Sequence, residues 1–474
     1  MSNLEDVKGV LNEYGQEHLL SFYNNLNMNE QNLLFDQVSK IDFHLVDKLY
    51  NISQEEKQKQ PIFQFENASR FNQEDILQAN QLDNPDYGGL TDVEQIKQIN
   101  KKEISINSKL MERIYASTIE KKIDCIEPIE HLDKSKISEE DKKKYEEIGL
   151  EAVKKGQYAV VTMAGGQGTR LGFNGPKGAY ILDLDTEKKS LFEILCSRLK
   201  EIKNQYGVVI PWYIMTSSEN NNDTIKFFEI NKYFGYPKES IKFFVQGELP
   251  MILKNGNIVL EEKWKVKEGA DGHGGIFTAL KKNHITDEMR ENGVKWFFVC
   301  GIDNILAKLV DLEFLGLVID QKVLVASKSV LKANPTEKVG VFCLRNGRPS
   351  VVEYTEISDE MSKQTLADGE LKFSEANILA HIFSIDLVDL IEGGELPYHV
   401  ALKKTDYIDE NGKKVIPTEE NAYKFECFIF DAFYKADRML VLRVKREQEF
   451  APIKNAEGVD SPQTARELYI KYIK

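Results

Sequence analysis

The chain has 474 residues, with 62 basic and 76 acidic side chains and a formal net charge of −14. So acidic a chain is a poor non-specific ligand for nucleic acid or an anionic membrane, and we expect neither as a partner. Its five cysteines are scattered without a CxxC pair, which argues against a disulfide framework or a zinc site. No signal peptide or membrane-length apolar run is visible, so we expect a cytoplasmic protein.

The chain divides by composition into three segments. Residues 1–52 carry apolar side chains three or four positions apart, a spacing that predicts amphipathic helices. Lys, Glu, Gln and Asn dominate from 53 to 145, and we interpret this range as a polar helical and loop insert without assigned chemistry. Residues 146–474 alternate strand-type and helical patterns, and we expect them to form the catalytic domain.

Five short apolar runs in the third segment predict buried strands. They are Tyr158–Met163, Pro211–Thr216, Ile241–Val245, Trp296–Cys300 and Val323–Ser327. Helical patterns occur between them, at Ser190–Tyr206 and Gly275–Lys282. This alternation predicts an α/β fold with a Rossmann-like mixed sheet flanked by helices. A hairpin formed by Val339–Leu344 and Ser350–Tyr354, with Asn346-Gly347 at its turn, is expected to add to that sheet.

The most informative segment directly follows the first predicted strand. It reads MAGGQGTRLG from Met163 to Gly172 and continues with GPKG from Gly175 to Gly178. Closely spaced glycines let the backbone approach a ligand, and consecutive N–H groups can then form an anion-binding concavity. Arg170 and Lys177 add positive charge beside it. Splitting a triphosphate needs this combination, because negative charge builds on the departing pyrophosphate. The alternative is a tight turn without a ligand.

GGQGTRLG followed by GPKG resembles the signature loop of the eukaryotic-type UDP-sugar pyrophosphorylases. Within that family it is most similar to the UDP-N-acetylglucosamine pyrophosphorylases. Further segments fit the family pattern in the same order, namely GQEHLL (Gly15–Leu20), PWYIMTS (Pro211–Ser217), KYFGY (Lys232–Tyr236), DGHGG (Asp271–Gly275), DNIL (Asp303–Leu306), NPTEKVGV (Asn334–Val341), VVEYTEI (Val351–Ile357), YHVALKK (Tyr398–Lys404) and FAPIKN (Phe450–Asn455).

The resemblance implies a nucleotidyltransferase with an N-terminal helical extension. The given sequence departs from the family pattern in one respect, since we expect no full C-terminal β domain after DSPQTAR. The resemblance also implies that a sugar 1-phosphate attacks the α-phosphorus of UTP, giving a UDP-sugar and pyrophosphate, with Mg²⁺ as cofactor. N-acetylglucosamine 1-phosphate is the expected sugar substrate. His273 stands where the acetylglucosamine enzymes usually carry Asn and the glucose-type relatives His. Glucose 1-phosphate, or a broad range of sugars, therefore remains an alternative. A non-catalytic UDP-sugar sensor is less favoured.

The resemblance also assigns the nucleotide-binding residues. Gly165 and Gly166 are expected to face uracil and ribose, and Gly168, Thr169 and Arg170 to face the triphosphate. A second group, expected near the base, consists of Gln246, Gly272 and His273. Gln246 follows a predicted strand, and its amide can read the polar edge of uracil. Its alternative role is to cap the end of that strand.

Three catalytic residues and one metal ligand follow from the same resemblance. Lys177 is expected to neutralise the α-phosphate and the leaving group, together with Arg170 and a second lysine, Lys454 in FAPIKN. Asp303 comes just after a predicted strand, at the end where open α/β sheets bind ligands, and its hard carboxylate suits Mg²⁺. The alternative role of Asp303 is a helix N-cap.

The expected sugar pocket consists of Gly340, Glu353, Tyr354 and Asn377. Glu353 can accept hydrogen bonds from sugar hydroxyls, and the amide of Asn377 can both donate and accept. For Tyr354 the alternative is burial on a strand face. The resemblance places Phe428 and Phe430, on a strand-like run, near the N-acetyl group, and packing in the core is an equally good interpretation of both.

Overall fold

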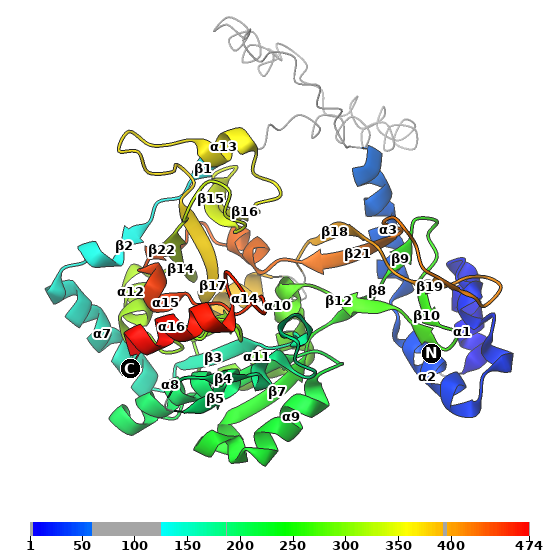
Figure 1. Cartoon of the computed structure of the whole chain (residues 1–474), viewed down its shortest axis with the longest axis horizontal. Coiled ribbons are helices and arrows are strands. Elements are labelled where there is room, and N and C mark those ends of the chain that lie inside the picture. Colours follow the sequence, from blue (N-terminus) through cyan, green and yellow to red (C-terminus); the bar gives the residue numbers. More distant parts are fainter. Residues whose placement is uncertain (1–2, 59–124, 186, 392–395, 474) are drawn as a thin grey trace, which may run out of the picture. The chain divides into compact units, whose positions relative to one another are not determined.

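The computed structural model describes residues 3–58, 125–185, 187–391 and 396–473 (Figure 1). Backbone contacts divide the chain into two compact units, Met1–Ser53 with Cys125–Lys474, and Gln54–Asp124. Most of the polar insert predicted at 53–145 therefore lies outside the described residues. The last part of that range, from Cys125 onward, belongs to the first unit, where it contributes two strands and the start of a helix.

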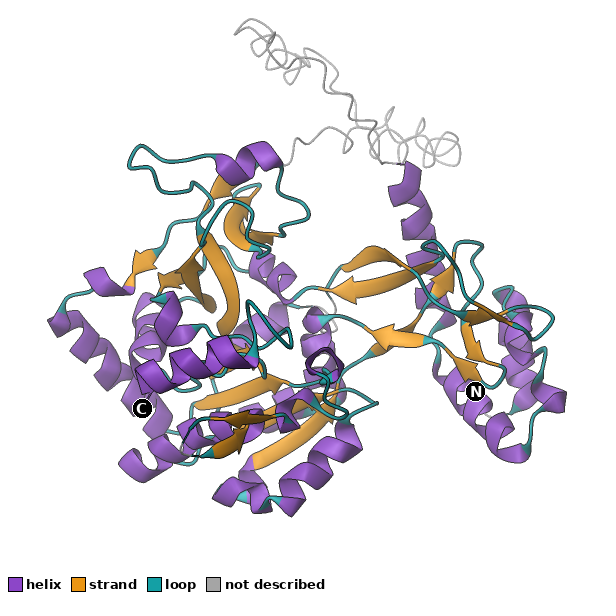
Figure 2. Ribbon diagram, in the orientation of Figure 1, coloured by secondary structure: helices purple, strands orange, loops and turns teal. Residues whose placement is uncertain are grey.

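A central mixed sheet organises the first unit (Figure 2). Its strands lie in the spatial order β2 (Leu132–Asp133), β22 (Leu440–Arg443), β14 (Val325–Leu331), β17 (Glu375–Ser384), β13 (Trp296–Gly301), β3 (Tyr158–Met163), β6 (Trp212–Thr216) and β7 (Ile241–Val245). From β13 to β7 all neighbours are parallel, whereas β17 is antiparallel to both β13 and β14. β1 (Ile126–Pro128), β15 (Val341–Arg345) and β16 (Arg348–Val352) join this sheet beside β17. The predicted mixed α/β sheet is thus confirmed.

Helices cover both faces of the sheet, so its central strands are buried over most of their length, and β3 over all of it. Along β3, Val160 packs into the core on one face and Val161 into the core on the other. The first face is covered by α7 (Glu139–Lys154), α8 (Leu191–Tyr206), α9 (Asn221–Ile230), α12 (Leu312–Gln321) and α16 (Pro462–Ile473). The second face is covered by α10 (Ile276–Lys282), α11 (Ile285–Glu291) and α14 (Ile385–Leu390). Ser190, predicted as the first residue of α8, is its N-cap and accepts the Glu193 N–H at 3.1 Å.

The strand expected at Val323–Ser327 starts and ends later, as β14. Its second half contains Lys328 and Ser329, which are both buried. Lys328 is only 1% exposed and its ammonium contacts the carboxylates of Asp311 and Glu449, both buried as well. A buried lysine needs such partners, because an unpaired charge in the core is very costly. The apolar pattern therefore ends before the strand does.

The predicted hairpin is confirmed as β15 and β16. Asn346 and Gly347 at its turn both have positive φ, 53° and 75°, as a two-residue turn with the twist of the flanking strands requires. The prediction that a strand continues through Phe428 and Phe430 was wrong. β21 (Ala422–Cys427) ends one residue earlier, because its partner β18 (Tyr398–Lys403) begins opposite Cys427 and offers no further pairing.

The N-terminal helices predicted within residues 1–52 are present as α1 (Leu4–Glu13), α2 (Met28–Lys40) and α3 (Phe43–Gln58). Their apolar side chains share a core with the small sheet of β18, β21 and β9 (Ile252–Leu253). The remaining elements are β4 (Ile181–Asp183), β5 (Lys188–Ser190), β8 (Glu248–Pro250), β10 (Leu260–Glu262), β11 (Lys265–Val266), β12 (Glu268–Ala270), α13 (Asp359–Lys363), β19 (Tyr407–Ile408), β20 (Lys414–Val415) and α15 (Arg446–Glu449). None of the helices in the described residues combines the length and the apolar character that crossing a membrane takes.

Helices α7 and α12 cross at two buried glycines. A Cβ on Gly149 of α7 would lie 2.0 Å from the backbone oxygen of Leu312. A Cβ on Gly316 of α12 would lie 1.7 Å from the backbone oxygen of Tyr145. Both contacts involve backbone, which cannot rotate out of the way, so the crossing requires glycine on both helices.

We predict that Gly316→Ala destabilises the fold by ~3 kcal/mol or more, because the helices must separate to accommodate the methyl group. Urea denaturation followed by circular dichroism measures the change. Gly9→Ala is the matched control, since Gly9 lies within α1 and a Cβ there meets no atom within 4 Å. That control is expected to be neutral or to stabilise by roughly 0.5–1 kcal/mol. An unchanged denaturation midpoint for Gly316→Ala would contradict the interpretation of the crossing.

Candidate functional site

The candidate site lies at the carboxyl ends of the parallel strands. Met163 at the end of β3 pairs in register with Gly301 of β13 on one side and with Met215 of β6 on the other. The segments that follow these strands therefore start next to one another. The glycine loop follows β3 and Asp303 follows β13, while Gln246 comes directly after β7 and donates its N–H to Thr216 of β6 at 2.8 Å.

The glycine loop is closed by its own backbone hydrogen bonds. The Lys177 N–H donates to the Gly166 carbonyl at 3.0 Å, and the Gly168 N–H donates to the Gly175 carbonyl at 2.9 Å. These two bonds bring GPKG back against GGQG. Because the loop is closed in this way, Lys177 returns to the end of β3 from which the loop departs.

Asn220 fixes this loop from behind and was missed by the sequence analysis. It is fully buried at the start of α9, and its Nδ2 donates to the carbonyls of Ala164 at 3.0 Å and Gly166 at 3.3 Å. Its Oδ1 accepts the N–H of Ser217 at 2.9 Å. A buried amide that satisfies loop carbonyls is typical of a rigid site. In the sequence it appears only as one polar residue among several after PWYIMT.

The predicted nucleotide-binding glycines have different surroundings. A Cβ on Gly165 would lie 2.8 Å from Oε1 of Gln246, so the amide of Gln246 covers Gly165. A Cβ on Gly166 meets no atom within 4 Å, and this residue is exposed. Gly168 is buried, and a Cβ there would lie 2.7 Å from the ring of Phe173. The open face of the loop is therefore at Gly166, with Gln246 beside it.

Thr169 and Arg170 lie on the exposed 3₁₀ turn that follows Gly168. The guanidinium of Arg170 forms no ion pair with any other described residue. Lys177 is more enclosed, and its Nζ lies 3.6 Å from Oδ2 of Asp303. The structure thus brings Lys177 and Asp303 together across β3 and β13, while Arg170 remains available to an anion at the rim.

The side chains around Asp303 show which kind of divalent-cation site could form here. Within the described ranges, no cluster of three or more His, Cys, Asp or Glu side chains could hold a metal ion. Mg²⁺ in phosphoryl-transfer sites is commonly bound by one or two carboxylates, with substrate phosphates and water completing its shell. A single carboxylate at a strand end fits that mode, and it does not fit a cage built from protein ligands alone.

The FAPIKN segment is hydrogen-bonded to Asp303 through its backbone, but the ammonium of its lysine pairs with a different acid. The Ile453 N–H donates to the Asp303 carbonyl at 3.0 Å. Nζ of Lys454 lies 3.6 Å from Oδ2 of Asp460 and 5.7 Å from the ring centre of Phe450. Lys454 is therefore adjacent to the site through its main chain, while its ammonium is paired with Asp460.

Asn304, also missed by the sequence analysis, attaches FAPIKN to the end of β13. Its Oδ1 accepts the Ala451 N–H at 2.9 Å, and its Nδ2 donates to the Glu449 carbonyl at 2.8 Å. It is 4% exposed, so these bonds form in a dry environment where they are strong. The position of Lys454 thus depends on a buried amide next to Asp303.

The DGHGG turn is wedged between Gly247 and β21. A Cβ on Gly272, which has φ +85°, would lie 2.3 Å from the backbone oxygen of Cys427. The carboxylate of Asp271 is packed so closely that a Cβ on Gly247 or on Gly275 would lie 2.1 Å from one of its oxygens. Gly272 is therefore required by this close approach of two backbone segments, whether or not a base lies over it.

His273 contacts the aromatic residues that follow β21. Its Nδ1 accepts the Ile429 N–H at 3.0 Å, and its ring centre lies 5.4 Å from that of Phe428 and 5.8 Å from that of Phe430. Burial lowers the pKa of His273 to about 4. The ring is therefore neutral near pH 7, and the protonated nitrogen is Nε2. The sequence analysis assigned His273 to the nucleotide, whereas one of its nitrogens is already used to hold the Phe428–Phe430 segment.

Three of the four predicted sugar residues lie together. The Asn377 N–H donates to the Gly340 carbonyl at 2.9 Å. A Cβ on Gly340 would lie 2.7 Å from Oε1 of Glu353. Burial, aided by nearby Glu356, raises the pKa of Glu353. Tyr354 stands apart, because its side chain is among the exposed large ones of the described residues, at 45%.

Comparison with known proteins places the chain among nucleotide-sugar enzymes. The family described as UTP–glucose-1-phosphate uridylyltransferase matches residues 102–459. A UDP-N-acetylglucosamine pyrophosphorylase of Saccharomyces cerevisiae is 40% identical over 69% of this chain and 71% of its own. UDP-N-acetylglucosamine diphosphorylase 2 of Arabidopsis thaliana is 38% identical over 73% and 70%. The Trypanosoma brucei uridine diphosphate N-acetylglucosamine pyrophosphorylase, solved with an inhibitor, superposes with a TM-score of 0.66 at 32% identity and covers 73% of each chain.

The shifted pKa of the Asp271 carboxyl leads to a prediction about how the stability of the fold depends on pH. Burial, with a smaller contribution from Glu248, raises its pKa from 3.8 to about 7 against the opposing effect of Lys282. The folded protein therefore keeps a proton that the unfolded chain loses above about pH 4, so this group's contribution to stability is full below pH 4 and is lost as the pH rises through 7. Asn imitates the protonated carboxyl at every pH.

We therefore predict that Asp271→Asn raises the melting temperature relative to wild type by several degrees at about pH 8 and by less at about pH 5. Thermal denaturation of both proteins at the two pH values measures this. The lowered pKa of His273 has the opposite effect, since that stability is present above 6.5 and lost as the pH falls towards 4. Both proteins share this effect, so their difference isolates Asp271. A difference in melting temperature between Asp271→Asn and wild type that is the same at both pH values would contradict the prediction.

Proposed function

This chain belongs to the UTP–glucose-1-phosphate uridylyltransferase family, and we propose that it transfers the uridylyl group of UTP to N-acetylglucosamine 1-phosphate. The products are UDP-N-acetylglucosamine and pyrophosphate. The observation that carries the proposal is the pairing of Lys177, on a closed glycine loop, with Asp303 at the ends of adjacent parallel strands. The names of the similar proteins support the choice of N-acetylglucosamine.

The reaction needs charge neutralisation and positioning, and no covalent intermediate with the enzyme. A phosphate oxygen of the sugar 1-phosphate attacks the α-phosphorus of UTP, and the bond from that phosphorus to the bridging oxygen of the β-phosphate breaks. Lys177 stabilises the charge that develops on the α-phosphate and the leaving pyrophosphate. Its ammonium is already directed to the edge of the sheet by Asp303, so little reorganisation is needed.

The other residues of the loop hold the remainder of the triphosphate. The backbone at Gly166 is open, and the adjoining Thr169 and Arg170 are exposed on the same turn. Arg170 can bind two phosphate oxygens at once. Lys454 reaches the phosphates by leaving Asp460, a partly exposed pair that costs little to break. Asp303 would hold Mg²⁺ together with the phosphates, and the bound ion supplies further neutralisation of the developing negative charge.

Gln246 and the sugar residues account for recognition in this proposal. The amide of Gln246 covers Gly165 beside the open part of the loop, where it can both donate to and accept from the edge of uracil. Glu353 and Asn377 meet at Gly340 and can hydrogen-bond sugar hydroxyls. Phe430 is buried in the core, and the partly exposed Phe428 stacks on it at 5.0 Å between ring centres, so Phe428 offers an apolar surface for an acetyl methyl group.

A glucose-specific transferase is the second candidate. One observation favours it: the matching family is described by glucose 1-phosphate. The resemblance stated above also expects His at position 273 in glucose-type relatives. In this structure His273 holds Ile429, which follows Phe428. His273 therefore supports the proposed acetyl surface, and we favour the acetylated sugar.

The substrate is tested by incubating the protein with UTP, Mg²⁺ and one sugar 1-phosphate, and measuring pyrophosphate release. We predict turnover with N-acetylglucosamine 1-phosphate to be at least about tenfold faster than with glucose 1-phosphate, because one apolar group in a fitted pocket gives roughly 10–200-fold discrimination. N-acetylgalactosamine 1-phosphate is measured alongside. Equal or faster turnover of glucose 1-phosphate would overturn the assignment.

Lys177→Ala is predicted to slow pyrophosphate release by about 100-fold or more while leaving the circular dichroism spectrum and melting temperature nearly unchanged. The loss is expected mainly in kcat, because the charge that Lys177 meets develops in the transition state. Lys188→Ala is the matched control, since Lys188 is an exposed lysine whose nearest acid is Asp183 at 3.5 Å. If both variants retain full turnover, Lys177 has no part in the mechanism.

A further inference from the structure

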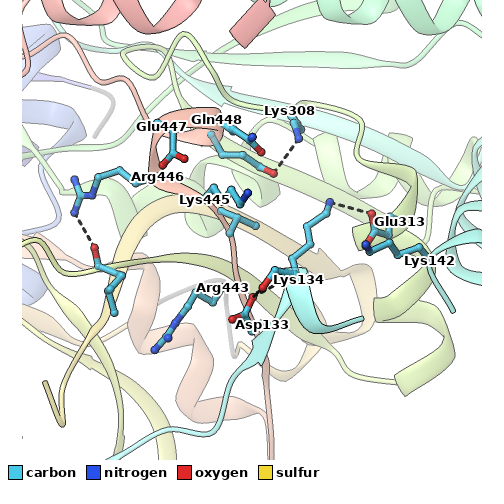
Figure 3. Close-up of a pocket in the computed structure, with 14 residues that line it drawn as sticks. Asp133, Lys134, Lys142, Lys308, Glu313, Arg443, Lys445, Arg446, Glu447 and Gln448 are labelled. Carbon is cyan, nitrogen blue, oxygen red and sulfur yellow. Dashed lines mark hydrogen bonds and ion pairs between the residues drawn. The ribbon is translucent and has the colours of Figure 1, made fainter. Parts of the chain in front are cut away.

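A large cavity lies away from the glycine loop, at the edge of the sheet formed by β2 and β22 (Figure 3). Its volume is about 680 Å³, within the range of small-molecule sites. It is lined by Asp133, Lys134, Ser135, Lys142, Lys308, Glu313, Leu331, Arg443, Val444, Lys445, Arg446, Glu447, Gln448 and Glu449. None of the residues assigned above to the nucleotide, the sugar or the metal is among them.

The charge of this lining contrasts with that of the chain. It contains the cations Lys134, Lys142, Lys308, Arg443, Lys445 and Arg446, and the acids Asp133, Glu313, Glu447 and Glu449. Six cations minus four acids leave two positive charges in the lining itself. Acids just behind the lining, namely Asp311, Glu337, Glu370 and Glu375, pair with Lys134, Arg446 and Arg443, so an anion is attracted to the cations that lack such a partner.

Two of these cations remain available to an anion. Lys445 is exposed and has no acidic partner within 4 Å among the described residues, and Figure 3 shows it between Arg446 and Lys134. Among the described residues Lys142 forms an ion pair with Glu139 alone, an acid of the same helix that is 89% exposed. An ion pair as exposed as this contributes little, so a bound anion readily replaces Glu139.

The lining also contains buried polar atoms without a hydrogen-bond partner. Nε of Arg446 is a donor of this kind, although its Nη2 pairs with Glu337 at 2.7 Å. Oε1 of Glu313 is an acceptor of this kind, although its Oε2 lies 3.1 Å from Nζ of Lys134. Both atoms lie behind the surface of the cavity wall, so a ligand meets the accessible groups of the lining instead. The ammoniums of Lys445 and Lys142 suit phosphate oxygens, and the side chains of Glu447 and Gln448 suit sugar hydroxyls.

The wall of the cavity is fixed by the buried charges behind it. Glu449, at the end of α15, binds Lys308 at 3.1 Å and the buried Lys328. Lys328 and Lys134 bind Asp311 at 2.6 Å and 3.2 Å. Burial alone raises the pKa of Asp311, but the two lysines hold it well below its usual value, so the carboxylate is ionised. A cavity backed by such a network is preformed and does not need to be opened by a ligand.

We propose that this cavity binds a hexose phosphomonoester. Lys445 and Lys142 take the phosphate, and Glu447 and Gln448 take the hydroxyls of the sugar. The size of the cavity excludes a nucleic acid or a folded protein as the occupant of its interior. The inference concerns a second site and stands whether or not the proposed transfer reaction is correct.

The site is connected to the catalytic edge through α15. Arg446 and Glu449 belong to this helix, and the chain runs on from it into Phe450–Asn455, which is bonded to Asp303 and Asn304. A ligand that bridges α15 to α7 and β2 therefore restrains the segment that carries Lys454. Binding is expected to raise the melting temperature, because the ligand binds the folded state only.

Isothermal titration of the full chain with glucose 6-phosphate tests the proposal. This sugar has its phosphate away from C1 and is no substrate for the proposed transfer. We expect one binding site, weakened by about tenfold or more in Lys445→Glu, because a charge-assisted contact is replaced by repulsion. Lys177→Ala, altered in the glycine loop, is expected to bind as wild type does. Lys8→Glu, with the same charge change on exposed α1, is the matched control.

Three outcomes would overturn the proposal. The first is the absence of binding to the wild type. The second is binding that Lys177→Ala abolishes and Lys445→Glu leaves intact, which would place the sugar phosphate at the glycine loop. The third is sulfate binding as tightly as glucose 6-phosphate, which would show that the cavity recognises any anion and not the sugar. Lys445 is exposed, so Lys445→Glu is expected to fold, and its circular dichroism spectrum verifies this.

Discussion

The parallel pairing of β3 with β13 and β6 is the constraint on which the rest of the site depends. Because Met163 is in register with Gly301 and Met215, the loops after three strands leave the sheet at one level. Lys177 and Asp303 are 126 positions apart in the sequence, yet their side chains come within 3.6 Å. A shift in register would separate this pair and would also reverse the faces to which Val160 and Val161 point.

Buried amides and buried charges convert this common edge into a rigid site. Asn220 holds the glycine loop from β6's side, and Asn304 holds FAPIKN from β13's side. The backbone carbonyl of Glu449 accepts a hydrogen bond from Asn304, and the carboxylate of Glu449 pairs with the buried Lys328. Each of these groups is costly to bury without its partner, so the partners specify one arrangement of the loops. Catalysis by positioning requires such pre-organisation.

The sequence predicted the apolar parts of the fold better than the polar ones. Continuous apolar runs located β3 and β7 to the residue, and Asn346-Gly347 located the hairpin, because local side-chain preference decides both. The end of β14 could not be predicted from the sequence. Lys328 is buried inside this strand because it pairs with Asp311 and Glu449, which are distant in the sequence. Asn220 and Asn304 escaped notice for the same reason: nothing local distinguishes a buried amide from an exposed one.

The mixed character of the sheet places the two proposed half-sites on different strands. The parallel strands carry the glycine loop, whereas Asn377 lies on antiparallel β17, beside Gly340. There β17 is irregular: its pairing with β14 shifts between Ser327 and Ser329, and Leu379 has φ 55°. The Asn377 Oδ1 accepts the Leu379 N–H at 2.9 Å, which stabilises this unusual backbone. A Cβ on Gly301 would lie 3.2 Å from Leu379 and 2.6 Å from Asp303, so the irregular part of β17 reaches the end of β13 that precedes Asp303. The strained part of β17 therefore lies between the two proposed half-sites. In the proposed reaction the sugar phosphate meets the α-phosphate there.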